Sequence, residues 1–486
     1  MKKTNIVILL LILTLFFVGP ARAEVEFSEE LFVELAEGTI AIPEIEIPDY
    51  RRVELDNGMI FYLSEDDELP VVELRGYILG GRSQETQETA GVANIMAHLM
   101  NTGTQNFSER ELIRYKELNG LELNISSGRD RFSFSGSALI GEQQELYSLL
   151  AEKLRNPRFD GDYFQRIIQE SYQGVMQGYY DEDSLLAMYF NKNIYGEKHP
   201  YSFGSNLDLL LSTLQQLTPD KVERFYRKTV DPSQIIIAIS GDIEIEETVA
   251  LLEEEFTDWE SKNTKLKDPA IVLNSDNFNR ILLVNKEDAT HAKMRMGYNF
   301  YDSSFEKRAA FRIGDRIFGG GDFSSRLVDN LRVQRGYVYA AYSVSSYNQL
   351  GGVYYITTDV DPGKAYITMA EIKQEMEAIS RGRDPITEEE VDNRLNLFNA
   401  LYPQSFTSRI GTLNHIMYNI EVRERGEDPI NEYIQEINAL TANEVQQVFA
   451  DYSFPHRFLT VIVGNKDDIL PAFEEQGLQV EVVDAF

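Results

Sequence analysis

The stretch GVANIMAHLMNTGT, residues 91–104, decides how this chain folds and limits the chemistry it can perform. Its apolar residues recur at helical spacing and predict one buried stripe, made of Val92, Ile95, Met96, Leu99 and Met100. The other face carries Asn94, Ala97, His98 and Asn101. The pattern therefore predicts an amphipathic helix that packs on a core and turns this second face away from it.

The second face has the spacing of an inverted zinc-peptidase motif without its chemistry. Such a motif, H-x-x-E-H, places two imidazoles one helical turn apart and a glutamate that activates the metal-bound water. Here the three positions hold Asn94, Ala97 and His98. Zinc prefers imidazole, thiolate or carboxylate to an amide, and alanine cannot accept a proton. We therefore expect this helix to bind no metal and to lack a general base.

The first residues, 1–23, are typical of a secretory signal peptide. A positively charged start precedes an apolar run from Ile6 to Val18, and the sequence ARA at 21–23 is a small-x-small cleavage signal. The apolar run is short for a membrane span of about 20 residues, so cleavage is favoured over an uncleaved anchor. We expect a mature chain that begins at Glu24, is exported to a periplasm or out of the cell, and has no stable membrane anchor.

Composition excludes several classes of function. Asp and Glu number 79 against 46 Lys and Arg, which gives a net charge of −33 and argues against nucleic acid as a partner. The absence of cysteine excludes a disulfide, a thiolate metal site and a cysteine nucleophile. The length of 486 residues is too great for one core and predicts several packed domains.

An internal repeat defines the domain organisation. The segment LTPDKVERFYRKTVDPSQIIIAISGD at 217–242 matches LTANEVQQVFADYSFPHRFLTVIVGN at 440–465 with a constant offset of 223 residues and no gaps. Each copy is predicted to be a capped helix, a proline-marked turn and a buried strand. A period this long indicates a duplicated domain. We predict a first domain over 24–257, a polar linker over 258–279 and a second domain over 280–486.

The remaining pattern is α+β. Two or three strands are predicted within 51–85, with Asp56-Asn57-Gly58 as a tight hairpin turn. Further strands are predicted around 121–127 and 131–138, and helices over 108–119, 142–154 and 160–180.

Several motifs make the chain resemble the insulinase/pitrilysin family of inverted-motif zinc peptidases, in the two-domain form of mitochondrial processing peptidase subunits and bacterial relatives. These motifs are LDNG at 55–58, GGRSQE at 80–85, G-x-A-x-x-x-x-H-x-x-x-x-G-T at 91–104 and HPYSFGS at 199–205. The resemblance covers about residues 45–480 of the sequence. It implies two duplicated α+β domains, each a mainly antiparallel sheet with helices on one face.

The resemblance also suggests roles for particular residues. The segment GGGDFSSRLVDNLRVQRGYVY at 319–339 is similar to a family segment with an arginine and a tyrosine seven residues apart, and Arg332 and Tyr339 match that pair. In the family these donors hold the substrate backbone near the scissile bond. The family's third zinc ligand is the second glutamate of an E-x6-E pair, where this chain has Glu170 and Gln177. That ligand is therefore lost.

The resemblance implies a non-catalytic, secreted subunit of a heterodimeric zinc peptidase. Its partner would be a sister peptidase chain with an intact H-x-x-E-H motif, and that partner would hold the zinc while Arg332 and Tyr339 position extended peptides. The alternative is a peptide-binding or scaffold protein with the peptidase fold and no peptidase partner. A third hypothesis is residual hydrolysis with a metal on His98, Glu170 and Asn94. Structural or surface roles are expected for the other histidines, which are His199, His291, His415 and His456.

Overall fold

The computed structural model describes residues 40–262, 266, 279–320 and 324–485. The predicted signal peptide and most of the predicted linker lie outside these residues. The first residues of that linker belong to the first half of the molecule, because Trp259 packs on its core and Lys262 donates its backbone N–H to the Asp231 carboxylate at 2.9 Å. None of the helices in the described ranges is long and apolar enough to cross a bilayer.

The first half of the chain builds a six-stranded sheet in the order β1-β2-β6-β3-β5-β4. Only β2 and β6 run parallel, and the other neighbours are antiparallel. The predicted turn at 56–58 links β1 to β2, and Gly58 takes the left-handed φ of 86° that the turn requires. The strands are β1 (Arg51–Glu54), β2 (Ile60–Glu65), β3 (Val71–Leu79), β4 (Glu122–Ser127), β5 (Arg131–Leu139) and β6 (Ile235–Gly241).

The second half repeats this sheet in the order β12-β7-β11-β8-β10-β9. Here β7 runs parallel to both β11 and β12, and the remaining neighbours are antiparallel. The strands of the internal repeat, β6 and β11, take equivalent places, so the predicted fold class is confirmed. The strands are β7 (Ile281–Asn285), β8 (Ala292–Phe300), β9 (Val338–Ser346), β10 (Gly352–Val360), β11 (Leu459–Gly464) and β12 (Glu481–Asp484).

Most helices of each half pack over one face of that half's own sheet, and two cross to the other sheet. Those of the first half are α2 (Val92–Thr102), α3 (Glu109–Leu118), α4 (Gln143–Arg155), α5 (Gly161–Gly178), α6 (Glu182–Tyr195), α7 (Pro200–Phe203), α8 (Leu207–Gln216), α9 (Pro219–Thr229) and α10 (Ile245–Phe256). Those of the second half are α11 (Arg308–Phe318), α12 (Arg326–Val328), α13 (Ala365–Ser380), α14 (Glu388–Leu401), α15 (Arg409–Glu421), α16 (Pro429–Asn438), α17 (Ala442–Tyr452) and α18 (Lys466–Glu474).

Short single turns join these elements. The 3-10 turns are η1 (Gly81–Gln84), η2 (Gln87–Thr89), η3 (Ile140–Glu142), η4 (Pro232–Gln234), η6 (Pro362–Lys364), η7 (Tyr402–Phe406) and η8 (Pro455–Arg457). Unlike these, η5 (Asp329–Gln334) is a π-helix.

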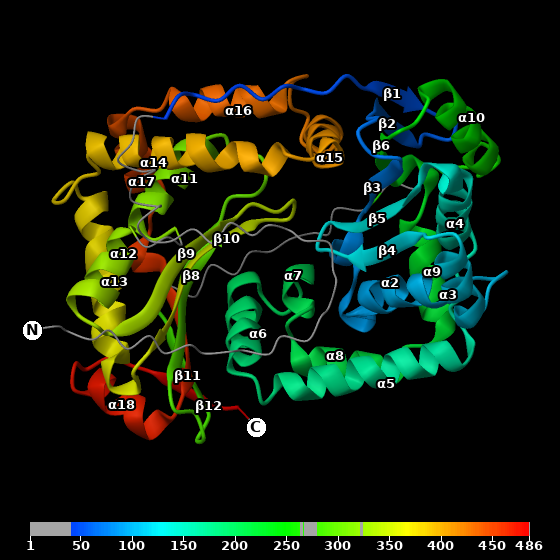
Figure 1. The fold of residues 1–486 in the computed structure, drawn as a ribbon. Coiled ribbons are helices and arrows are strands. Elements are labelled where there is room, and N and C mark those ends of the chain that lie inside the picture. Colours follow the sequence, from blue (N-terminus) through cyan, green and yellow to red (C-terminus); the bar gives the residue numbers. More distant parts are fainter. Residues whose placement is uncertain (1–39, 263–265, 267–278, 321–323, 486) are drawn as a thin grey trace, which may run out of the picture.

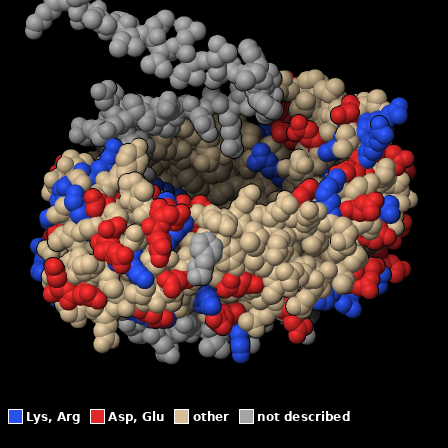
Figure 2. All heavy atoms as spheres, turned by 90° about the horizontal axis from the view of Figure 1, so that it is seen from below, with Lys and Arg blue, Asp and Glu red and all other residues tan. Residues whose placement is uncertain are grey.

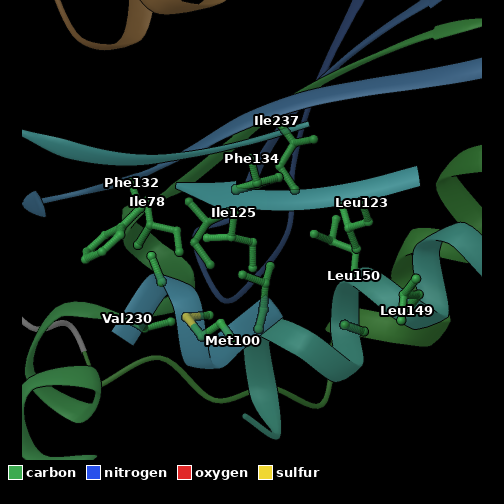
Figure 3. Packing of buried hydrophobic residues seen from close by; sticks show 14 of the residues in the cluster. Ile78, Met100, Leu123, Ile125, Phe132, Phe134, Leu149, Leu150, Val230 and Ile237 are labelled. Atoms are coloured by element: carbon green, nitrogen blue, oxygen red, sulfur yellow. The ribbon is translucent and has the colours of Figure 1, made fainter. Parts of the chain in front are cut away.

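The first core lies between its sheet and helices α2, α4 and α9. The apolar stripe predicted for residues 91–104 is 0–1% exposed, and Figure 3 shows Met100 of α2 among Ile125 of β4 and Phe132 of β5. On α5, Met176 is 38% exposed although the sequence pattern puts it on the apolar face. Consecutive helical residues point about 100° apart. Val175 packs against the core, and Met176 therefore points away from it.

The second face of each sheet is covered by a helix from the other half. Helix α15 packs on β2 and β6 in one apolar cluster, whose buried members include Leu413, Ile416 and Met417. Helix α6 packs in the same way on β8 and β11. Figure 1 shows these two helices crossing from one half to the other on opposite sides of the molecule. The two halves thus exchange helices, and Figure 2 shows the hollow that lies between them.

Truncation of a crossing residue tests this exchange. Leu413 is 0% exposed on α15 and packs against the first sheet, so Leu413→Ala removes transfer free energy and leaves a cavity. We expect the free energy of unfolding in urea to fall by about 2–5 kcal/mol. The matched variant Leu118→Ala changes a leucine that is 72% exposed and is expected to cost less than about 0.5 kcal/mol. Equal losses for the two variants would contradict the packing described here.

Candidate functional site

Helix α2 begins at a buried carboxylate. Gly91 takes the left-handed φ of 84° at the helix N-cap, and the Glu85 carboxylate accepts the Ala93 N–H at 2.9 Å. Burial raises the pKa of Glu85 to about 7. Hydrogen bonds from the backbone N–H groups of Ala93 and Gly91 and the charge of Arg82 oppose this shift. The GGRSQE segment therefore has a structural function, which is to place an acceptor at the positive end of α2.

The exposed face of α2 is narrower than the sequence pattern predicts. Asn94 and His98 are exposed, one helical turn apart, but Ala97 is 0% exposed. The sequence pattern groups Ala97 with the polar face, which is wrong because α2 packs on α5 and α9 as well as on β4. Asn94 is tied to the sheet, since its Oδ1 accepts a hydrogen bond from the Ser127 hydroxyl at 3.3 Å.

Glu170 and Gln177 are both exposed on α5, the helix that packs beside α2. Glu170 lies 3.8 Å from Arg166, which pairs more closely with Glu109 of α3 at 2.6 Å. Glu170 is thus part of a surface ion-pair group between α5 and α3. Gln177 sits in the last turn of α5, and its amide is a poor replacement for a carboxylate ligand.

These residues do not fit zinc. The three motif positions supply one imidazole, one amide and a buried methyl group, whereas a catalytic zinc site needs three good ligands and a base. Throughout the described ranges, no group of three His, Cys, Asp or Glu side chains is placed to hold a metal ion. The chain therefore keeps the helical frame of the motif and lacks its donor set.

The second predicted pair, Arg332 and Tyr339, is brought together. Arg332 belongs to the π-helix η5, a conformation common at functional sites, and its guanidinium carbon lies 5.7 Å from the centre of the Tyr339 ring. Tyr339 is the second residue of β9, the edge strand of its sheet, and is 84% exposed. Val333 beside them is 67% exposed. Two hydrogen-bond donors therefore stand together near the start of an edge strand.

A buried lysine behind α2 is a feature that the sequence analysis does not identify. Lys153 of α4 is 0% exposed and donates to Asn101 Oδ1 at 3.2 Å and to the Leu123 carbonyl at 3.0 Å. Burial lowers the pKa of Lys153 to about 7, and the nearby charge of Lys116 adds to the shift. The only signal in the sequence is a lysine within the apolar run LLAEKL of α4.

The HPYSFGS segment of the first half makes hydrogen bonds to the second half. His199 is 4% exposed, and its Nε2 lies 3.1 Å from the carbonyl oxygen of Leu350, in the connection between β9 and β10. The Leu350 N–H donates to the Tyr201 hydroxyl at 3.0 Å, and that hydroxyl donates to the Asp130 carboxylate. His199 is therefore a buried structural residue at the contact between the two halves, as the sequence analysis expects. A strand connection of the second half is held by three side chains of the first.

Comparison with protein families places both halves of the chain. The model described as insulinase (peptidase family M16) matches residues 62–199, which include the degenerate helix α2. The model described as peptidase M16 inactive domain matches residues 216–398, which include Arg332 and Tyr339. The two matches follow each other along the chain without overlap.

Similar proteins carry names of both kinds, peptidase and non-peptidase. A Bacillus subtilis protein named uncharacterized zinc protease YmxG is 20% identical over 395 residues, 81% of this chain and 93% of its own. A Helicobacter pylori protein named non-peptidase homolog YmxG is also 20% identical, over 78% of this chain and 89% of its own.

Solved structures share the fold. A protease from Helicobacter pylori superposes with a TM-score of 0.76 at 19% identity, over 86% of this chain and 100% of that one. A peptidase M16 inactive domain from Pseudomonas fluorescens gives a TM-score of 0.74 at 18% identity, over 86% and 98%.

Restoring one ligand tests whether the frame of the motif survives on α2. Asn94→His places a second imidazole one turn from His98 on an exposed face, so we expect the variant to bind Zn²⁺ measurably more tightly than the parent in a chelator-competition titration. The control Asn94→Gln, which keeps an amide at this position, is expected to match the parent. Equal zinc affinity for Asn94→His and Asn94→Gln would mean that the two positions do not face a common point.

The lysine behind α2 predicts a specific dependence of stability on pH. An unfolded lysine takes up its proton near pH 10, whereas folded Lys153 does so only near pH 7, so in this window the unfolded state binds more protons. The free energy of unfolding should therefore rise with pH, by up to about 1.4 kcal/mol per unit between pH 7.5 and 9.5.

Urea unfolding at three pH values in this window measures the rise. Lys153→Met removes the titrating group and is expected to flatten the profile, whereas Lys307→Met, at an exposed lysine, is expected to keep it. A profile for Lys153→Met as steep as that of the parent would show that another group is responsible.

Proposed function

This chain belongs to the insulinase family of peptidases, M16, and from that membership we propose that it is the non-catalytic, substrate-positioning subunit of a heterodimeric zinc peptidase. Its partner is a sister chain with an intact H-x-x-E-H motif, which binds the zinc and performs hydrolysis. The substrates are extended peptides. The leader-like residues 1–23 support export of the chain to a periplasm or out of the cell.

Loss of catalysis in this chain is supported by the donor set of α2. Peptide hydrolysis by this family of motifs needs a metal-bound water and a base that takes its proton. Asn94 and His98 are exposed at ligand spacing, but the position of the base is a buried alanine. The name non-peptidase homolog, borne by the Helicobacter pylori relative, is compatible with the same loss.

The observation that carries the positioning role is the survival of Arg332 and Tyr339 as a contacting pair. The Arg332 guanidinium carbon lies 5.7 Å from the centre of the Tyr339 ring, and a cation over the ring leaves the tyrosine hydroxyl able to donate a hydrogen bond to a peptide carbonyl. A guanidinium carries five N–H donors, so Arg332 can bond a peptide carbonyl in addition to its contacts within the chain. The pair stands near the start of β9, the edge strand of its sheet, and an extended peptide would add beside this part of the strand. A chamber built by two chains needs one metal site and one such pair of donors.

Turnover by the assembled pair tests this proposal. The mature chain alone is expected to be inert on a quenched-fluorescence peptide, and its mixture with the nearest encoded H-x-x-E-H sister chain is expected to be active. Arg332→Ala in this chain should lower kcat/KM of the mixture by about 100-fold or more, as loss of an oxyanion donor does. The zinc content of the mixture should remain one per pair, because Arg332 binds no metal.

A matched control separates positioning from general damage. Arg335→Ala removes another arginine close to η5, one that pairs with Glu371 at 3.0 Å, and is expected to leave turnover unchanged. Inactivity of the mixture, with no complex on a sizing column, would refute the heterodimer and favour a peptide-binding or scaffold protein. Activity and stoichiometric zinc in the lone chain would refute the loss of catalysis.

A further inference from the structure

Helix α11 of the second half is the structural counterpart of α2. The burial pattern of residues 91–100, in which only the fourth and eighth positions are exposed, is repeated without change at 309–318. This offset of 218 places Arg312 where the first half has Asn94, and Arg316 where it has His98. The positions that carry zinc ligands in an intact motif therefore carry two exposed arginines in the second half.

Arginines dominate this face of α11. Arg308, Arg312 and Arg316 follow each other at intervals of four residues and so lie in one row along the helix. Like charges at this spacing destabilise a helix by a few tenths of a kcal/mol per pair. The chain has 79 acidic and 46 basic residues, so three arginines in one row are more than its composition leads one to expect. Helix stability does not account for it.

The row lines a pocket of about 530 Å³ between α11, β9 and the α15–α16 pair. Arg423 and Arg425, on the connection between α15 and α16, line the same pocket. The charges of these two residues lower the pKa of Arg308, second to the effect of burial. The arginines of the two walls therefore face a common space and repel one another.

Four of the five arginines form no ion pair with a carboxylate within the described residues. Arg308, Arg423 and Arg425 form no ion pair within the described parts of the chain, and Arg312 donates to the Tyr433 hydroxyl at 3.3 Å. Among the described residues that line the pocket, the acids are Asp315, Glu432 and Glu436, so five arginines stand against three acids.

Asp315 offers little compensation to this charge. It is 4% exposed, and its carboxylate accepts hydrogen bonds from the hydroxyls of Ser343 and Tyr354 at 2.5 and 2.9 Å. Burial raises its pKa and so disfavours the negative charge. The positive charge of the pocket is thus available to a ligand.

We propose that this pocket binds the carboxylates of an acidic peptide segment. Guanidinium groups from two walls match the geometry of carboxylate oxygens, and the tyrosines of the lining, at 347, 402 and 433, offer apolar surface to the side-chain stems. The volume suits several side chains better than a single small ion. The choice of a peptide rests on the proposed function.

Strand β9 connects the pocket with the Arg332–Tyr339 pair, because it carries Tyr339 and also contributes to the lining of the pocket. Ser343 and Ser345 of β9 line the pocket, and Tyr339 stands near the start of that strand. At about 3.3 Å per residue, the two places are separated by roughly 13–20 Å. An extended peptide of about five residues spans this distance, so one chain can reach both sites.

Binding to the lone mature chain tests the pocket without any sister subunit. The probes are acetylated triglutamate, acetylated triglutamine and pyrophosphate, titrated by calorimetry at constant ionic strength. We expect saturable binding of triglutamate and none of triglutamine. The double variant Arg423→Gln/Arg425→Gln should weaken triglutamate binding by about tenfold or more, because charge-assisted hydrogen bonds are lost.

A control of equal charge is available at the end of α13. Arg381→Gln/Arg383→Gln also removes two exposed arginines two residues apart, and is expected to leave triglutamate affinity unchanged. Binding is measured on the lone chain and turnover on the assembled pair, so failure of the pocket and failure of the peptidase-subunit proposal give different results. Circular dichroism of each variant checks that it is folded.

Three outcomes would overturn the assignment. The first is absence of saturable triglutamate binding. The second is an equal loss in the Arg381/Arg383 control, which would mean that overall charge alone attracts the probe. The third is binding of pyrophosphate without triglutamate, which would make a phosphate group the ligand in place of peptide carboxylates.

Discussion

Each of the two sheets has two apolar faces, and its own half of the chain covers only one of them. The other face is covered by a helix that crosses from the opposite half, α15 over the first sheet and α6 over the second. Burial of these faces provides a large part of the driving force for folding. Neither half covers both faces of its own sheet, so each half depends on the other for part of its stability. The His199 and Tyr201 contacts with Leu350 then fix the two halves at one more point.

Contacts within the first half explain why the frame of the motif on α2 persists after its chemistry is lost. The residues that seat α2 are the apolar stripe, Gly91, the Glu85 carboxylate and the Asn101–Lys153 pair, and none of them is a zinc ligand. Ligand positions can change while these contacts hold the helix in place. The same reasoning applies to α11, which keeps the burial pattern of α2 and carries arginines at the equivalent positions.

Much of this architecture could be predicted from local pattern. The strands and helices predicted between residues 51 and 180, the turn at 56–58 and the capped helix, turn and strand of each repeat fall where periodicity and turn chemistry place them. The site was less predictable. Ala97 is small enough for either environment, and its burial depends on α5 and α9, which are distant in sequence. Lys153 is marked in the sequence only by its place in the apolar run LLAEKL, and its environment is set by Asn101 and Leu123.

The sequence by itself determined the duplicated α+β fold and the absence of most zinc ligands from the motif, because spacing and side-chain chemistry are local properties. It also selected Arg332 and Tyr339, through a motif whose residues are close along the chain. Only the tertiary structure decided which helix covers which sheet, how Leu350 is held, and that Arg308, Arg312, Arg423 and Arg425 share one pocket. Those contacts join residues about 100 or more positions apart, and their geometry depends on the packing of whole elements, which no local pattern encodes.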